Sequence, residues 1–181
     1  MNMGKDLFFS QQALFTLFSA TNKLQMQGDK YLQELTIRQI LAIPAIIHAP
    51  DGKATINHIA RSLGTTKQNA KQIVNVMERK QYISTAPSQK DKRAVDITIL
   101  PEGEEAFRLC SRRIDELLAD VFQDFSTEEL EMLWTLLSKL YRFDGAEQDN
   151  AKEHAPRHSV DFDELLRHHS YYVKRRTENR A

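Results

Sequence analysis

Two short apolar stripes separated by a tight turn restrict the fold of this chain more than any other feature. Each stripe places apolar residues at positions i, i+3, i+4 and i+7, the spacing of one face of an α-helix. The stripes are Ile56, Ile59, Ala60 and Leu63, followed by Ala70, Ile73, Val74 and Met77. Between them, Gly64 is suited to end the first helix, and Thr65 or Thr66 to cap the second. This arrangement predicts a helix–turn–helix.

A basic hairpin is expected shortly after the second of these helices. Two strand-like runs, 82–86 and 95–99, enclose a polar and basic segment at 87–93. The whole chain has zero net charge, yet nine cationic and only two acidic side chains lie within residues 53–93. A helix–turn–helix followed by a basic hairpin is the layout of a winged helix. We therefore expect a mainly α-helical chain with a small β-hairpin wing, whose winged lobe spans residues 35–100.

The polar face of the second helix carries side chains that can recognise DNA. Gln and Asn can form two hydrogen bonds with adenine, and Lys can reach guanine or a phosphate. The N-terminus of the helix also attracts phosphate. Such a face can equally be a solvated surface, but its place next to a basic hairpin favours nucleic acid. The candidate DNA-binding residues are Thr65, Thr66, Lys67, Gln68, Asn69, Lys71, Gln72, Asn75, Lys90, Lys92 and Arg93.

Long helices are expected on both sides of the winged lobe. Residues 1–34 contain one predicted helix, over about residues 7–26 and ended by the pair Gly28-Asp29, and residues 101–143 predict two. The second of these two opens with a capping box that starts at Ser126. Their apolar stripes need burial, and a second copy of the chain is the simplest source, although packing within one chain is the alternative. The expected dimer contacts are Leu14, Leu17, Phe18, Leu117, Val121, Leu133, Trp134, Leu137 and Tyr141.

The last part of the chain, residues 144–181, is more polar than the rest. It predicts a linker, then a short helix suggested by Val160, Phe162, Leu165, Leu166 and Tyr172, and then a basic tail. The tail begins with Lys174, Arg175 and Arg176, which either contact phosphate or belong to a disordered basic end.

The hairpin region resembles the wing signature of MarR-type regulators, the multiple-antibiotic-resistance repressors. The similar residues are Asp91-Lys92-Arg93-Ala94-Val95, followed by Ile97, Ile99 and Gly103, together with Leu35-Thr36, Gln39 and the run Met77-Glu78-Arg79-Lys80. The resemblance covers about residues 7–143. It implies a transcriptional regulator, expected to be a repressor, that acts as a homodimer on a pseudo-palindromic operator.

The resemblance also implies roles for the elements of the lobe. The second helix of the motif would enter the major groove, and Lys90, Lys92 and Arg93 would lie beside the neighbouring minor groove. Asp91 is acidic and therefore suits the role of holding the wing, by pairing with Arg93 or another cation.

The sequence departs from the family pattern in three places. Leu100 stands where the family has a threonine, so the next helix lacks a hydroxyl cap. Gln81 stands where a glycine is common, which predicts a positive φ. Residues beyond Asp144 extend past the family's last helix.

A small lipophilic or phenolic effector is a further expectation from the resemblance. The family's pocket lies between the dimer helices and the DNA-binding lobe, and the residues expected near it are Phe15, Phe18, Tyr31, Ile43, Ile47 and His48. These residues can equally be ordinary core residues. Cys110 is the single cysteine, and its place on an apolar stripe predicts packing as a small hydrophobe rather than redox sensing.

Other classes of function have little support in the sequence. No nucleophile elbow, P-loop or zinc-protease motif is present, so we expect no enzyme and no cofactor. His154 and His158 are four residues apart, but Pro156 breaks the helix that a metal site would need. No apolar run is long enough for a membrane span, which predicts a cytoplasmic, nucleoid-associated protein. The alternative function is a winged-helix module that binds proteins and no longer reads DNA.

Overall fold

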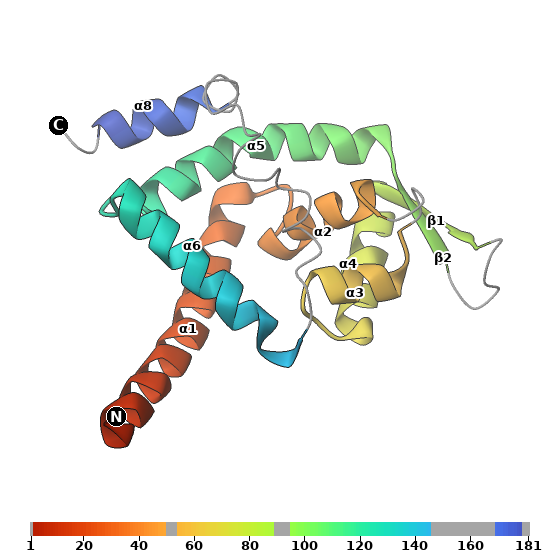
Figure 1. The fold of residues 1–181 in the computed structure, drawn as a ribbon. Coiled ribbons are helices and arrows are strands. Elements are labelled where there is room, and N and C mark those ends of the chain that lie inside the picture. The colour runs from red at the N-terminus through yellow and green to blue at the C-terminus, as the bar shows by residue number, and fades with distance from the viewer. Residues whose placement is uncertain (1, 50–53, 89–94, 146–168, 179–181) are drawn as a thin grey trace.

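The computed structural model describes residues 2–49, 54–88, 95–145 and 169–178. In chain order its elements are α1 (Met3–Leu32), α2 (Ile37–Ile47), α3 (Ile56–Ser62), α4 (Lys67–Arg79), β1 (Ile83–Pro87), β2 (Val95–Ile99), α5 (Pro101–Val121), α6 (Thr127–Tyr141), the 3₁₀ turn η2 (Arg142–Asp144) and α8 (Ser170–Glu178). Figure 1 shows a winged lobe of α2, α3, α4 and the hairpin beside the long helices α1, α5 and α6. The predicted mainly helical fold with one small hairpin is confirmed.

The core of the winged lobe is built from the two predicted apolar stripes. Ile59 of α3 and Val74 and Met77 of α4 are at most 1% exposed. They belong to one buried cluster with Ile83 of β1 and Ile97 of β2, so the hairpin is packed on the helices. The two strands are antiparallel and form a sheet of their own. This packing holds the wing strands beside α4.

Local sequence explains where the short helices begin and end. Thr36, Thr55 and Thr66 each accept a hydrogen bond from the third amide of the helix that follows. Gly64 comes after α3 with φ of +58°, a left-handed conformation that glycine adopts without steric cost. Pro44 lies inside α2 and does not divide it, because the helix continues to Ile47 around a largely buried face.

α1 extends beyond the helix over residues 7–26 that the apolar spacing predicts. The pair Gly28-Asp29, expected to end it, lies inside the helix and joins it to α2. A Cβ on Gly28 would be 2.4 Å from Cγ1 of Ile37, and the Asp29 carboxylate accepts a hydrogen bond from the Ile37 amide at 2.7 Å. Gly28 therefore serves close helix packing rather than a turn, and α1 continues to Leu32.

The start of α5 is joined closely to the turn that follows α4. Gln81 has φ of +59°, as its position predicts, and Leu100 forms the N-cap of α5 without a side-chain hydrogen bond. The Leu100 amide donates to the carbonyl oxygen of Tyr82 at 2.9 Å. A Cβ on Gly103 would be 2.1 Å from that same oxygen, so only glycine fits here. These contacts join the winged lobe closely to the long helix α5.

The C-terminal helix α8 packs along the second half of α5, at the end opposite the hairpin (Figure 1). Arg175 forms two hydrogen bonds with the carboxylate of Asp120, at 3.0 and 3.2 Å. Asp115, which is 5% exposed, pairs with His169 at 2.7 Å. The expected apolar residues of a short helix between 160 and 166 lie outside the described residues, and the described helix begins at Ser170.

Candidate nucleic-acid interface

The recognition surface predicted on α4 is exposed along the whole helix. Lys67, Gln68, Lys71, Gln72 and Asn75 are all exposed, whereas the opposite face of α4 is in the core. The surface therefore presents amide and ammonium groups to a partner without any rearrangement of the lobe. Amides suit adenine and ammonium groups suit guanine or phosphate.

The first turn of α4 is organised by side-chain hydrogen bonds. The Thr66 hydroxyl accepts from the Asn69 amide at 3.2 Å, and the Thr65 hydroxyl accepts from the Asn69 side chain at 3.3 Å. These three predicted contact residues therefore shape the N-terminus of the helix as well as offering polar groups. The amides of this first turn other than that of Asn69, which Thr66 caps, suit an anion such as a phosphate.

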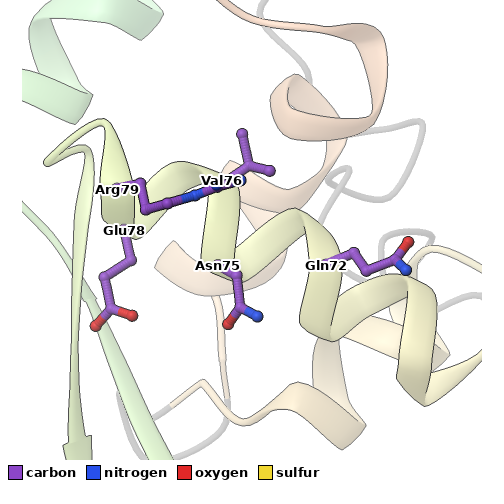
Figure 2. Close-up of a pocket in the computed structure, with 5 residues that line it drawn as sticks. All are labelled: Gln72, Asn75, Val76, Glu78 and Arg79. Atoms are coloured by element: carbon purple, nitrogen blue, oxygen red, sulfur yellow. The ribbon is translucent and has the colours of Figure 1, made fainter.

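A shallow hollow lies on the C-terminal half of α4, beside the hairpin strands. Gln72, Asn75, Val76, Glu78 and Arg79 line it (Figure 2). Figure 2 shows Asn75 and Glu78 projecting to the same side of the helix. The hollow continues the recognition surface from the first turn of α4 toward the wing, and it adds one acidic side chain to it.

The tip of the wing cannot be placed in the same way. Lys90, Asp91, Lys92 and Arg93 lie outside the described residues, so their expected contacts and the holding role of Asp91 stay predictions. The strands that carry this segment are placed. Pro87 pairs with Val95 at the outer end of the described hairpin.

The predicted dimer residues differ in how much surface they offer. Leu14 and Phe18 of α1 and Trp134 and Leu137 of α6 are between 40% and 64% exposed. Leu117 is only 8% exposed, because it packs beside Gly28 within the chain, and it is the predicted contact with least surface to give. The half-buried members of the set are Leu17, Val121, Leu133 and Tyr141.

An apolar groove lies between the long helices and the winged lobe, where an effector is expected. Among the residues predicted for it, only Phe18 lines this groove. Tyr31 instead donates a hydrogen bond to Asp120 at 2.7 Å, and this bond raises the pKa of the Tyr31 hydroxyl. Ile47 and His48 are at the end of α2, away from the lining, and Ile43 is in the core.

The lining of the groove that sequence reasoning missed comes mostly from α1, α2 and α5. Its apolar residues include Leu41, Ile73, Leu118 and Phe122, with Arg38 as the one charged residue in the lining. The Arg38 guanidinium donates to the Gln25 side chain at 3.3 Å. No spacing in the sequence brings Arg38 near residues eighty positions further along, so only the fold could reveal this groove.

The described part of the basic tail is helical rather than disordered, and its expected contact with phosphate stays a prediction. Arg175 pairs with Asp120, and Arg176, 9% exposed, donates to the Phe125 carbonyl at 2.5 Å. Both arginines therefore hold α8 on the long helices, and Lys174 is the exposed cation of the three. The sequence showed the cations but not their acidic and carbonyl partners.

Metal and thiol chemistry find no support in the described part of the chain. It contains no group of three His, Cys, Asp or Glu residues placed to hold a metal ion, and His154 and His158 lie outside it. Cys110 is fully buried beside the Leu32 carbonyl, and this burial raises the pKa of its thiol. None of the described helices is long and apolar enough to cross a membrane.

Comparisons with known proteins agree with this geometry. Residues 33–94 match the model of the MarR family. The chain is 24% identical over 143 residues to the transcriptional activatory protein BadR of Rhodopseudomonas palustris, covering 75% of this chain and 82% of BadR.

Two solved structures share the fold at 24% identity. A MarR/EmrR family transcriptional regulator from Acinetobacter sp. ADP1 superposes with a TM-score of 0.63, covering 74% of this chain and 94% of that one. MepR of S. aureus, solved as a complex with DNA, gives a TM-score of 0.61, covering 72% of this chain and 95% of MepR.

The fold and the exposed polar face of α4 are those of a winged-helix protein. The match over residues 33–94 places its winged lobe in the MarR family. The match confirms the resemblance to this family that the sequence shows, while Gly103 lies beyond the matched residues.

Proposed function

We propose that this protein is a homodimeric regulator that binds a pseudo-palindromic operator and responds to a small ligand. α4 reads bases in the major groove, and the hairpin contacts the neighbouring backbone and minor groove through Lys90, Lys92 and Arg93. The observation that carries the proposal is the exposed face of α4, which has amide and ammonium side chains and a hairpin packed beside it. MepR, which shares this fold, was solved on DNA.

The exposed apolar surface of the long helices supports a dimer. α6 contains no buried residue, and five of its large apolar side chains are at least 40% exposed. α1 adds Leu14, Phe15 and Phe18, each at least half exposed. Apolar surface of this extent marks a protein interface. In a two-fold dimer, this face of each protomer would be covered by the same face of the other. A two-fold dimer would set the two α4 helices about 34–36 Å apart, one turn of DNA.

The groove between the long helices and the lobe supports an effector site. It joins α1 and α5, two of the helices proposed for the dimer, to α2 and α4 of the winged lobe. A ligand there can shift DNA binding only if it prefers one arrangement of these parts over the other. The apolar lining suits a small lipophilic or phenolic molecule, and Arg38 offers it one polar contact.

Selection of bound duplexes from a random pool tests the DNA-binding function directly. We expect one enriched sequence with two related half-sites. The protein should bind it at least about a thousandfold more tightly than it binds random DNA. Affinity should fall steeply with salt, because phosphate contacts release counterions. A pool that shows no enrichment, with any binding insensitive to salt, would instead favour the protein-interaction module.

The direction of regulation is tested separately, with a reporter gene placed behind the selected operator. We propose that the protein represses transcription. Activation is the alternative that the experiment must distinguish, because the relative BadR is named as an activatory protein. Lower reporter output in cells that express the protein supports repression, and higher output contradicts it.

A further inference from the structure

The carboxylate of Glu78 joins the two DNA-reading elements of the lobe. Glu78 lies in the last turn of α4, and its Oε1 accepts two hydrogen bonds from Thr85 of β1. The Thr85 hydroxyl donates at 2.5 Å and the Thr85 amide at 3.2 Å. A carboxylate that accepts two hydrogen bonds from one residue restrains the position of that residue strongly.

The cross-strand pair that contains Thr85 also has a hydrogen bond on the outer side of β2. Thr85 is paired with Ile97 of β2, and the Ile97 amide donates to the Ala54 carbonyl at 3.0 Å. In a two-stranded sheet these outward amides have no strand partner, so each needs another acceptor. Ala54 supplies a backbone acceptor, and Glu78 supplies a side-chain acceptor. Of the two attachments, only the one made by Glu78 depends on a side chain.

A negative charge at this place needs a reason. Glu78 lines the hollow on α4 with Gln72 and Asn75, on the surface proposed to face DNA (Figure 2). A carboxylate there is repelled by phosphates, so a purely solvated Glu78 would only weaken DNA binding. Its two hydrogen bonds to the wing strand give it a role that offsets this repulsion.

We infer that Glu78 is a positioning residue for DNA binding, whose carboxylate fixes the wing hairpin against the recognition helix through Thr85. The inference rests on the proposed DNA-binding function. Because Ile97 holds the other edge, loss of the Glu78 bonds lets the hairpin tilt about that attachment without unfolding the lobe. Contacts made by the wing then lose their fixed distance from the contacts made by α4.

Two variants of Glu78 separate its charge from its hydrogen bonds. Glu78→Gln and Glu78→Ala both remove the negative charge, but only Gln keeps an oxygen that can accept from Thr85. We expect Glu78→Ala to bind the selected operator about five- to tenfold more weakly than Glu78→Gln, which corresponds to the loss of a neutral hydrogen bond. Fluorescence anisotropy with a labelled operator measures both constants.

Variants of Thr85 test the partner side with no change of charge. Thr85→Val removes the hydroxyl donor, and Thr85→Ser keeps it as the matched control. Thr85→Val should weaken operator binding, Thr85→Ser should not, and Thr85→Val combined with Glu78→Ala should be no weaker than Glu78→Ala alone, because both changes remove one connection. Thermal unfolding by circular dichroism checks that every variant keeps the fold.

Three outcomes would overturn the inference. If Glu78→Ala and Glu78→Gln bind equally, Glu78 acts only through its charge. If Glu78→Ala loses discrimination at a single base pair and Thr85→Val has no effect, Glu78 reads a base directly, since a carboxylate can accept from cytosine. If both changes weaken binding additively, the two residues act separately. A wild-type protein that binds no duplex contradicts the proposed function itself, which is a different result from any of these.

Discussion

At the scale of single residues, the proposed function divides the exposed side chains of α4 into those expected to read bases and those expected to neutralise phosphate. Gln68 and Lys71 are both exposed on the same helix, and they differ in chemistry. An amide can discriminate adenine, whereas an ammonium group gains mostly from charge. Substitutions on this surface should therefore have two different effects, a loss of base preference or a loss of affinity for all DNA sequences.

Gln68→Ala should relax base preference, while Lys71→Ala should weaken binding to all sequences. For Gln68→Ala we expect a loss of about 1–3 kcal/mol for the operator and little change for a random duplex. For Lys71→Ala both duplexes should lose affinity, and the slope of log affinity against log salt should fall by about 1. Titrations of both duplexes at several salt concentrations measure this; an equal loss on both duplexes for Gln68→Ala would contradict base reading.

Gly103 allows the closest approach between the winged lobe and α5, and replacing it should reduce stability. Gly103→Ala places a Cβ 2.1 Å from the Tyr82 carbonyl oxygen, which is backbone and cannot rotate away. We expect the free energy of unfolding to fall by about 1–3 kcal/mol, as for other overpacked sites. Urea unfolding followed by circular dichroism measures it.

Gly4 provides a matched control for that change. It is also helical, but the nearest atom to its added Cβ is Asn2 Oδ1 at 3.8 Å, which is ordinary contact. Gly4→Ala should leave stability unchanged or raise it, since alanine favours helix. Equal effects at Gly4 and Gly103 would show that the Tyr82 contact does not matter.

At the scale of elements, α8 depends on contacts between residues distant in sequence. Asp120 of α5 accepts hydrogen bonds from Tyr31 of α1 and from Arg175 of α8, so one carboxylate joins three helices. Asp120→Asn removes the charge that favours Arg175. We expect trypsin to cleave α8 about fivefold faster, a modest effect because this ion pair is partly solvated.

Mass spectrometry of the tryptic fragments measures that rate after Lys174, Arg175 and Arg176. Glu105→Gln is the control, because Glu105 pairs with Arg108 on an exposed part of α5 and not with α8. If Asp120→Asn and Glu105→Gln leave cleavage equally unchanged, Asp120 does not hold α8.

Elements set by local sequence could be predicted, and elements set by distant contacts could not. The apolar stripes of α3 and α4 and the capping box of α6 depend on residues within one turn or two, and the structure has them where the sequence indicates. The continuation of α1 past Gly28 depends on Ile37, and the position of α8 depends on Asp120, 55 residues before Arg175.

The candidate site shows the same division. The polar face of α4 follows from helical spacing, so its residues could be listed from the sequence. The bond from Glu78 to Thr85 crosses between a helix and a strand, and the groove that includes Arg38 is assembled from four helices. Neither follows from spacing along the chain, because each requires the packing of the lobe to be known.

At the scale of the whole molecule, the protomer leaves its long helices poorly covered. Trp134 is 51% exposed, so about half of its surface is open to a second protomer. Its removal should therefore weaken the proposed dimer more than the packing of a single protomer. The stability of the protein should therefore depend on its concentration, as it does when assembly and folding are linked.

Trp134→Ala should weaken dimerisation, because large aromatic residues dominate the energy of protein interfaces. We expect a loss of about 2 kcal/mol or more, which raises the dimer dissociation constant about thirtyfold. Sedimentation velocity over a range of concentrations measures it. Leu109→Ala is the control, because Leu109 is also 51% exposed but lies on α5 beside the lobe, lining a hollow with Glu34 and Tyr82. If the Trp134 variant dimerises as strongly as the control, α6 is not the dimer face. Another surface would then have to hold the two α4 helices at the spacing of the half-sites.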